Sequence, residues 1–289
     1  MEPSLPPDIE RYIADILALE EIQFPVRSKH CCLNLQLTAH RFHDWLLPHL
    51  FNVIFIQQGR RSHFPSTDHL PKHLALLKKY GNHTRKIKCY SPTWLNAVLP
   101  YCPNVEDVVL WPSSSSGGSD TIYTAHPTIQ MLSNLKRLSG TVGKLTKDDF
   151  LSPVYLGLTH LDIIGNMEWD LLTHLKYLTH LCFSHPPEDL AHTVGRLSEH
   201  DRLRVVIALR DSSRGQFKDP RLVLLRELDE SDWELGANGG MDFWEFAERI
   251  VLAREAGFIR NKDPSRVFRK SSFKADVELT IEGQIWWCK

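Results

Sequence analysis

Hydrophobic residues in the middle of the chain recur in short groups of the form L-x-x-L-x-L, in which Val, Ile or Phe can replace Leu. The clearest copy is Leu158-x-x-Leu161-x-Ile163, and similar groups span residues 105–110, 135–140 and 178–183. Further strand-like segments lie at 87–90, 203–209 and 222–225. The spacing is irregular, but it stays near the about 20–29 residues of a leucine-rich repeat. The pattern predicts one short strand per repeat.

The segments between these groups have helical character at 92–99, 128–135, 169–175 and 190–197. Each strand–helix unit can bury its leucines only against its neighbours, so stacked units would form a parallel sheet with one continuous core. The sequence therefore predicts an α/β fold with an irregular leucine-rich-repeat-like solenoid over residues 87–235. An ordinary α/β domain with leucine-rich strands is the alternative.

The regions on either side of the repeats differ in character. Residues 1–56 are predicted to form short helices, because Ile9, Ile13 and Ile16 share one helical face, and the segment ends in a strand at 51–56. Residues 57–86 are predicted to be a basic connector. Residues 236–289 are predicted to hold a helix that Asp242 caps, followed by a basic tail.

Composition narrows the class of protein without reaching a function. The 289 residues include 34 Lys and Arg against 35 Asp and Glu, so the formal net charge is −1. These proportions exclude a disordered chain, and they provide no overall field that would attract nucleic acid. No secretory signal or membrane-spanning run is present in the sequence, so we expect a cytoplasmic or nuclear protein with no membrane partner. The six cysteines form no C-x-x-C pair, which favours reduced thiols, and no metal or other cofactor is expected.

Strand alternation places a set of polar residues together. If the leucines of the repeats face the core, the residues between them lie on the opposite, exposed face of the sheet. Neighbouring strands would bring together His160, Asp162, His180 and Cys182, and Asp107 and Arg137 would extend this surface. We interpret it as a surface that binds a target protein. The alternatives are a solvated surface without a partner, and a hydrolase or metal site built from the four central residues.

Motifs of known enzymes are missing from the sequence. Residues 140–144 resemble a phosphate-binding loop, but Leu138 stands where the first glycine is needed and Leu145 follows the lysine. There is no G-x-S-x-G, H-E-x-x-H or G-x-G-x-x-G motif, so we do not expect an enzyme. The basic stretch 249–274 is the one candidate for nucleic-acid binding. Its interspersed acidic residues favour a solvated surface instead, and no nucleic-acid partner is expected.

Two motifs near the N-terminus carry a resemblance to a known family. Residues 5–17, LPPDIERYIADIL, resemble the first helix of an F-box, and residues 35–51, LQLTAHRFHDWLLPHLF, resemble its later part. Together with the repeats and the closing DPRLVLL…DFWEFAERIV, the whole chain resembles F-box-like proteins with degenerate leucine-rich repeats from mushroom-forming fungi. One departure is that residues 20–31, where an F-box has its second helix, are mostly polar and contain Pro25.

The resemblance implies a protein-interaction adaptor. The F-box-like segment would bind a Skp1-like subunit of a cullin ubiquitin ligase, and the repeats would hold a protein target. The residues that would contact Skp1 are Leu5, Pro6, Ile9, Ile13 and Trp45. A second interpretation is that these helices only cap the open end of the solenoid, as terminal repeats do. In that case Ile9, Ile13 and Leu17 would be buried against the strand at 51–56.

Overall fold

The computed structural model describes residues 6–23, 40–56, 70–111, 121–165, 167, 169–186, 189–197, 200–209, 217–228, 230–260, 263, 265–270 and 277–288. The departure from the F-box pattern around Pro25 and the candidate contact residue Leu5 lie outside these ranges.

Within the described residues, nine parallel strands form one sheet, and their order in space is their order in the chain. The strands are β1 (Val53–Ile56), β2 (Lys86–Cys89), β3 (Asp107–Leu110), β4 (Arg137–Thr141), β5 (His160–Ile164), β6 (His180–Phe183), β7 (Val205–Leu209), β8 (Leu222–Leu225) and β9 (Val267–Phe268). The predicted α/β class with a parallel sheet is confirmed, and every predicted strand from residue 87 to residue 225 corresponds to one of β2 to β8. The short strand β9 was not predicted.

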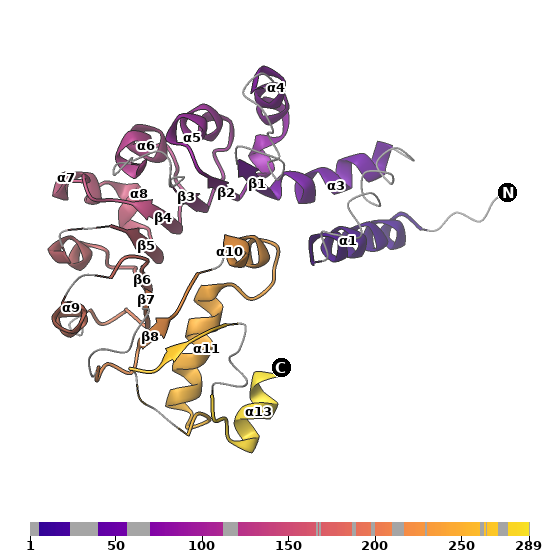
Figure 1. Ribbon diagram of the computed structural model, residues 1–289. Coiled ribbons are helices and arrows are strands. Elements are labelled where there is room, and N and C mark those ends of the chain that lie inside the picture. The colour runs from indigo at the N-terminus through magenta and orange to yellow at the C-terminus, as the bar shows by residue number, and fades with distance from the viewer. Residues whose placement is uncertain are drawn as a thin grey trace.

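The sheet is curved, and most of the helices lie along its outer, convex side (Figure 1). They are α4 (Leu70–Tyr80), α5 (Pro92–Val98), α6 (Thr121–Ile129), α7 (Lys147–Phe150), α8 (Pro153–Leu156) and α9 (Leu190–Leu197), with 3-10 turns at η2 (Gly81–His83), η3 (Leu99–Tyr101) and η4 (Trp169–His174). The helices predicted at 92–99 and 190–197 are confirmed. The helix predicted at 128–135 is wrong: α6 lies earlier and contains Pro127.

The register of the sheet explains why the leucine pattern recurs. Leu138 is paired with Leu161, and Leu161 with Leu181, so equivalent positions of successive repeats form a row across the sheet. These side chains are buried with the helices in one continuous aliphatic core on the convex side. The core therefore grows by one layer with each strand, as the stacking argument requires.

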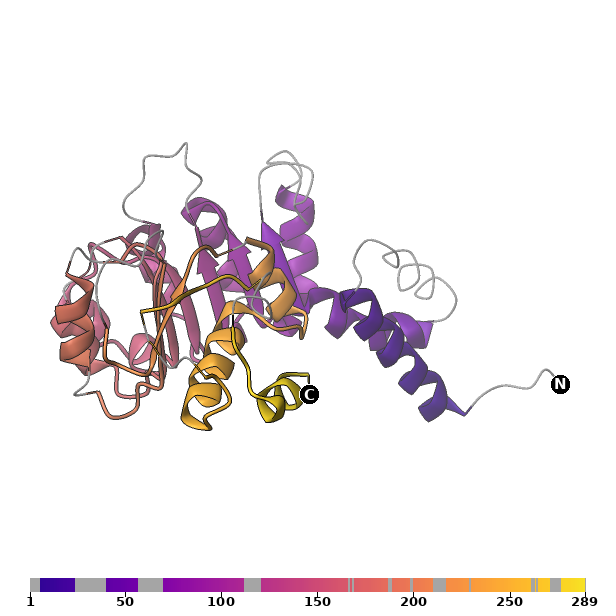
Figure 2. The same cartoon turned by 60° about the horizontal axis from the view of Figure 1, so that its bottom comes forward.

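The C-terminal part of the chain returns to the opposite, concave side of the sheet (Figures 1 and 2). It contributes α10 (Glu230–Ala237), α11 (Phe243–Glu255) and α13 (Ile281–Trp287), and β9 pairs with β8 at the edge of the sheet. Asp242 caps α11 as predicted, because its side chain accepts a hydrogen bond from the backbone N–H of Glu245. The described part of the predicted basic tail thus adds a strand to the sheet and a helix beside it.

The N-terminal helices α1 (Pro7–Gln23) and α3 (His40–Asn52) project away from the β1 edge of the sheet (Figure 2). They pack together through a small cluster in which Ala14 and Leu46 are buried and Phe42 and Trp45 are partly buried. Because α3 leads directly into β1, the segment 1–56 and the sheet are continuous. Part of the predicted connector 57–86 is helix α4. No helix among the described residues has the length and apolar character needed to cross a bilayer.

Candidate functional site

The predicted polar surface lies on the concave side of the sheet, as strand alternation required. On β5, for example, Leu161 faces the aliphatic core, whereas Asp162 lies on the opposite face. The predicted exposure of this surface is wrong, however: Asp107, Asp162, His180 and Cys182 are all buried.

The physical reason is that α11 and α10 cover this face. Phe243, Trp244 and Phe246 of α11 pack against apolar side chains of the sheet, including Val205 and Ile207 of β7. The apolar stripe of α11 and the apolar residues on the concave side of β7 and β8 were visible in the sequence. These two apolar surfaces, each without another partner in the sequence analysis, could have predicted that α11 packs on this face of the sheet.

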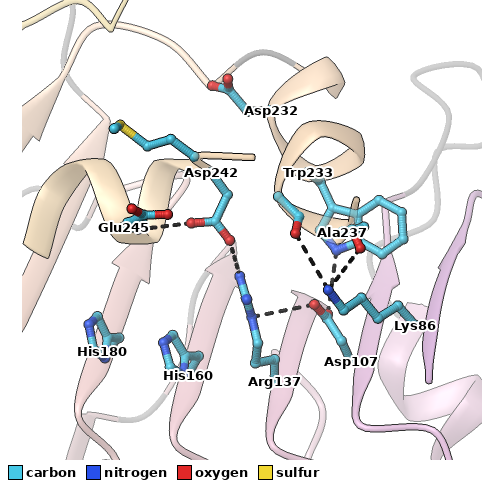
Figure 3. A network of polar contacts seen from close by, with 12 residues as sticks. Lys86, Asp107, Arg137, His160, His180, Asp232, Trp233, Ala237, Asp242 and Glu245 are labelled. Atoms are coloured by element: carbon cyan, nitrogen blue, oxygen red, sulfur yellow. Dashed lines mark hydrogen bonds and ion pairs between the residues drawn. The ribbon is translucent and has the colours of Figure 1, made fainter. Parts of the chain in front are cut away.

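A buried ion network joins the sheet to the start of α11 (Figure 3). The Arg137 guanidinium contacts Asp107 with its Nε atom, 3.4 Å from Oδ2, and its Nη2 donates a hydrogen bond to Asp242. The second oxygen of Asp242 accepts from the backbone N–H of Glu245, 2.8 Å away. Asp242 therefore caps α11 and fixes it to β4 with the same carboxylate.

The protonation of this network follows from burial and from the paired charges. Burial raises the pKa of Asp107, while Arg137 and a hydrogen bond from the indole of Trp233 offset part of that rise. Burial alone would lower the pKa of Arg137, but the carboxylates of Asp107 and Asp242 outweigh it, so the pKa is raised. Arg137 thus stays charged as the central cation of the network.

Two lysines of β2, which sequence reasoning did not select, extend these contacts toward the N-terminal strands. The ammonium group of Lys86 donates to the carbonyl of Ala237, 2.9 Å away, at the C-terminal end of α10, where the helix dipole favours a cation. Burial lowers the pKa of Lys86. The fully buried Lys88 lies 4.9 Å from the ring of Trp111 and 5.1 Å from that of Phe55, within cation–π distance.

Asp162 and Cys182 are enclosed beneath the network. The hydroxyls of Ser139 and Ser184 donate hydrogen bonds to the Asp162 carboxylate, the latter at 2.7 Å. Burial raises the pKa of Asp162, and burial with the nearby Asp162 raises that of the Cys182 thiol well above its usual value. A protonated, solvent-free thiol lacks the thiolate character of a nucleophile or metal ligand. Among the described residues, no group of three or more His, Cys, Asp or Glu side chains has an arrangement that could hold a metal ion.

His160 and His180 lie side by side on β5 and β6 (Figure 3). Their rings stack with centroids 4.1 Å apart and planes 6° apart, and the indole of Trp244 stands nearly perpendicular to both. Burial lowers the pKa of His160 to about 2 and that of His180 to about 4, with further lowering from neighbouring positive charge. Both imidazoles are therefore neutral near pH 7.

The residues predicted to contact Skp1 differ in their exposure. Pro6, Ile9 and Ile13 are exposed, with exposed fractions of 45% for Ile9 and 41% for Ile13. Trp45 instead packs between the helices, edge-on to Phe42. The burial of Ile9 and Ile13 that the capping interpretation requires is not observed.

Comparison with known proteins assigns the chain to no family: no protein-family model matches it, and no curated protein is similar to it in sequence.

Proposed function

We propose that this protein is a non-enzymatic protein-interaction adaptor. Its N-terminal helices would bind a Skp1-like subunit of a cullin ubiquitin ligase, and its curved sheet would hold a target protein. The observation that carries the proposal is a row of exposed apolar side chains on α1, formed by Ile9, Tyr12, Ile13 and Ile16.

The row has the geometry of a docking surface. Its members are spaced by three, one and three residues, so they share one helical face. The exposed fractions are 45% for Ile9, 67% for Tyr12, 41% for Ile13 and 37% for Ile16. Contiguous apolar surface of this kind is typical of sites that bind another protein.

The other side of α1 is fixed to α3, so the row is presented on a defined scaffold. Ala14 is buried against Leu46. The Arg41 guanidinium contacts Glu10 at 2.7 and 2.8 Å, and His49 lies 3.1 Å from Asp15. A partner that binds the row would therefore meet a preorganised surface and would not have to order the helix.

The arrangement of the sheet supports a leucine-rich-repeat-like solenoid as the second part of the adaptor. The strands are parallel, follow chain order and align their leucines in register, with helices on the convex side. Such stacked units provide an extended concave surface, which solenoid proteins use for binding. Because α10 and α11 cover much of this surface here, a target protein would bind around the hollow where α11 begins. The burial of Asp162 and Cys182 argues against a hydrolytic site built from them.

A pulldown of the full-length protein with purified Skp1 tests the proposal. We expect Skp1 to be retained by the wild type and lost with Ile9→Asp/Ile13→Asp, because two charges would have to be desolvated in the apolar interface. Met131→Asp is the matched control: it adds a charge at an exposed apolar position of the sheet body and should leave retention unchanged. No retention by the wild type would overturn the ligase role, and equal retention by the double variant would overturn the assigned surface.

A further inference from the structure

A hollow of about 270 Å³ opens on the concave side where α11 begins. Its walls are Arg137, His160 and His180 from the sheet, Asp242, Trp244 and Glu248 from α11 and its cap, and the glycine-rich loop before them. We name it the histidine hollow. Its size lies just below the roughly 300 Å³ at which pockets for whole small molecules begin, so it suits a single side chain.

The hydrogen bonds of the repeated Leu-Thr-His-Leu motif define the tautomers of both histidines. The Thr159 hydroxyl contacts the carbonyl of Lys136 at 3.1 Å and Nδ1 of His160 at 2.9 Å. A hydroxyl has one proton, and a carbonyl can only accept. Thr159 therefore donates to the carbonyl and accepts a hydrogen bond from Nδ1–H of His160.

The same arrangement recurs one strand later. The Thr179 hydroxyl donates to the carbonyl of Thr159, 3.1 Å away, and accepts from Nδ1–H of His180 at 2.8 Å. Both imidazoles are neutral with the proton on Nδ1, so each keeps a lone pair on Nε2.

Among the residues that the structure describes, no group donates a hydrogen bond to either Nε2 atom. His180 is only 5% exposed, and the polar contact that the structure gives its Nε2 atom is Oε2 of Glu248, 3.8 Å away. A carboxylate cannot donate a hydrogen bond, so two acceptors face each other there. The rings are nearly parallel, so their in-plane lone pairs run side by side and do not converge on one metal ion.

The charges around the hollow are balanced in pairs, so hydrogen-bonding capacity decides which group can bind there. Three carboxylates line it, from Asp242, Glu245 and Glu248, against the single guanidinium of Arg137, which is committed to Asp107 and Asp242. The other two carboxylates are paired at the surface: Glu248 with Arg204 at 2.9 Å, and Glu245 with Arg249 at 3.0 Å. The Arg204 side chain is largely exposed, so it can turn into solvent at little cost. An anion would meet only acceptor atoms at the two Nε2 lone pairs and the Glu248 carboxylate, so the hollow selects a group that donates hydrogen bonds.

We propose that the histidine hollow binds the guanidinium group of an arginine that the target protein presents. A guanidinium has five N–H donors and no acceptor, which matches the two Nε2 lone pairs and the Glu248 carboxylate. Its flat face can also lie against the indole of Trp244. The inference rests on the proposed function, since it assigns a target chemistry to the sheet of the adaptor.

The test uses the full-length protein with capped amino acids as probes. Acetyl-arginine-amide presents the side chain as a target protein would, and acetyl-citrulline-amide has nearly the same shape without the charge. Long-range ¹H–¹⁵N spectra report the imidazole nitrogens of His160 and His180 directly. We expect the arginine probe to shift both Nε2 signals in a saturable manner and the citrulline probe to leave them in place.

Three variants locate the effect. Glu248→Gln and His160→Phe should each weaken binding of the arginine probe about tenfold, because the first removes the negative charge that faces the guanidinium and the second removes one Nε2 acceptor. Phenylalanine keeps a flat ring against His180, so the fold should survive. Glu255→Gln removes an exposed carboxylate from the same helix outside the hollow and should change nothing.

Failure of this inference is separable from failure of the adaptor role. An absence of Nε2 shifts at millimolar arginine probe, or equal shifts with citrulline, would overturn the arginine site while Skp1 retention stood. Much tighter binding of free arginine than of the capped probe would overturn a protein target as the source. Loss of Skp1 retention in Glu248→Gln would overturn the separation of the two surfaces.

Discussion

The two faces of the sheet are built on different principles, although neighbouring residues of one strand contribute to both. Leu161 enters an aliphatic core on the convex face, and Asp162, the next residue, lies among hydroxyls and ion pairs on the concave face. The convex face is filled by helices that follow each strand closely in sequence. The concave face is filled by contacts across the whole chain: Arg137 and Asp242 are 105 residues apart, and Lys86 and Gly236 are 150 apart.

This difference shows how strictly each face requires one particular partner for each side chain. On the convex face, many similar aliphatic contacts stabilise each layer, and the exact partner of one leucine matters little. On the concave face, each charge needs a particular partner, because a buried charge without one is costly. The stability of the convex face therefore depends on the total apolar volume that is buried, whereas the stability of the concave face depends on a few individual contacts.

The largest effect is expected from truncation on the convex face. Leu161→Ala should lower the free energy of unfolding by about 4 kcal/mol, because it opens a cavity in a fully buried site. Urea denaturation followed by circular dichroism would measure it. A loss below about 1 kcal/mol would contradict the description of a tightly packed aliphatic core.

A slightly smaller loss, about 3 kcal/mol, is expected for Arg137→Met on the concave face. Methionine retains much of the apolar volume but leaves Asp107 buried beside an uncharged neighbour. The double variant Arg137→Met/Asp107→Leu should recover part of the loss in the same denaturation assay. Full additivity of the two substitutions would show that their side chains do not form a pair.

The next prediction concerns the pH dependence of stability, which arises on the concave face because both buried histidines lie there. The folded pKa values of His160 and His180, about 2 and about 4, lie below the usual 6.5, so as pH falls the unfolded chain takes up protons first. Their contribution to stability is complete above about pH 6.5 and declines as pH falls toward 4. Between pH 7 and pH 5 we expect a loss of about 2 kcal/mol from each histidine.

Urea denaturation at pH 5, 6 and 7 would measure this loss. The variant His160→Phe/His180→Phe should show a clearly smaller change, since phenylalanine cannot bind a proton. An identical pH dependence in both proteins would assign the acid sensitivity to other groups.

The smallest effect is expected from removing the hydroxyl group that accepts a hydrogen bond from His180. Thr179→Val should cost about 1 kcal/mol, because Nδ1–H of the buried His180 loses its acceptor. Thr173→Val is the control: its hydroxyl donates to the carbonyl of Asp170 at an exposed site, and the change should stay below about 0.5 kcal/mol. Equal effects of the two variants would contradict the proposed tautomer.

Local patterns in the sequence were sufficient for the elements whose partners lie close along the chain. The strands from β3 to β6 were predicted from the leucine pattern, and β2, β7 and β8 from short strand-like segments. The cap at Asp242 was predicted because a short polar residue precedes an apolar helical stripe. The misplaced helix α6 has a local cause: Pro127, which is typical of a helix start, lies near the end of this helix.

The candidate site was predicted only in part. Alternation of side chains along β5 and β6 correctly placed His160 and His180 on one face, but it carries no information on which distant segment covers that face. For the same reason no local pattern singled out Lys86, whose partner Ala237 is 151 residues away. The short strand β9 spans two residues, too few for a recognisable pattern.

Because α10 and α11 follow strands β1 to β8 in the chain, their position has a consequence for synthesis on the ribosome. Strands β1 to β8 can stack as they emerge, because each new strand pairs with the one before it and most are followed by a helix or 3-10 turn on the convex side. During that time Asp107, Arg137 and the two histidines remain hydrated and free to titrate normally. This face is buried from solvent only after residues 230–255 have emerged and packed over it. The concave face is thus completed last, and a nascent chain halted before α10 would expose charged and aromatic surface that the finished protein hides.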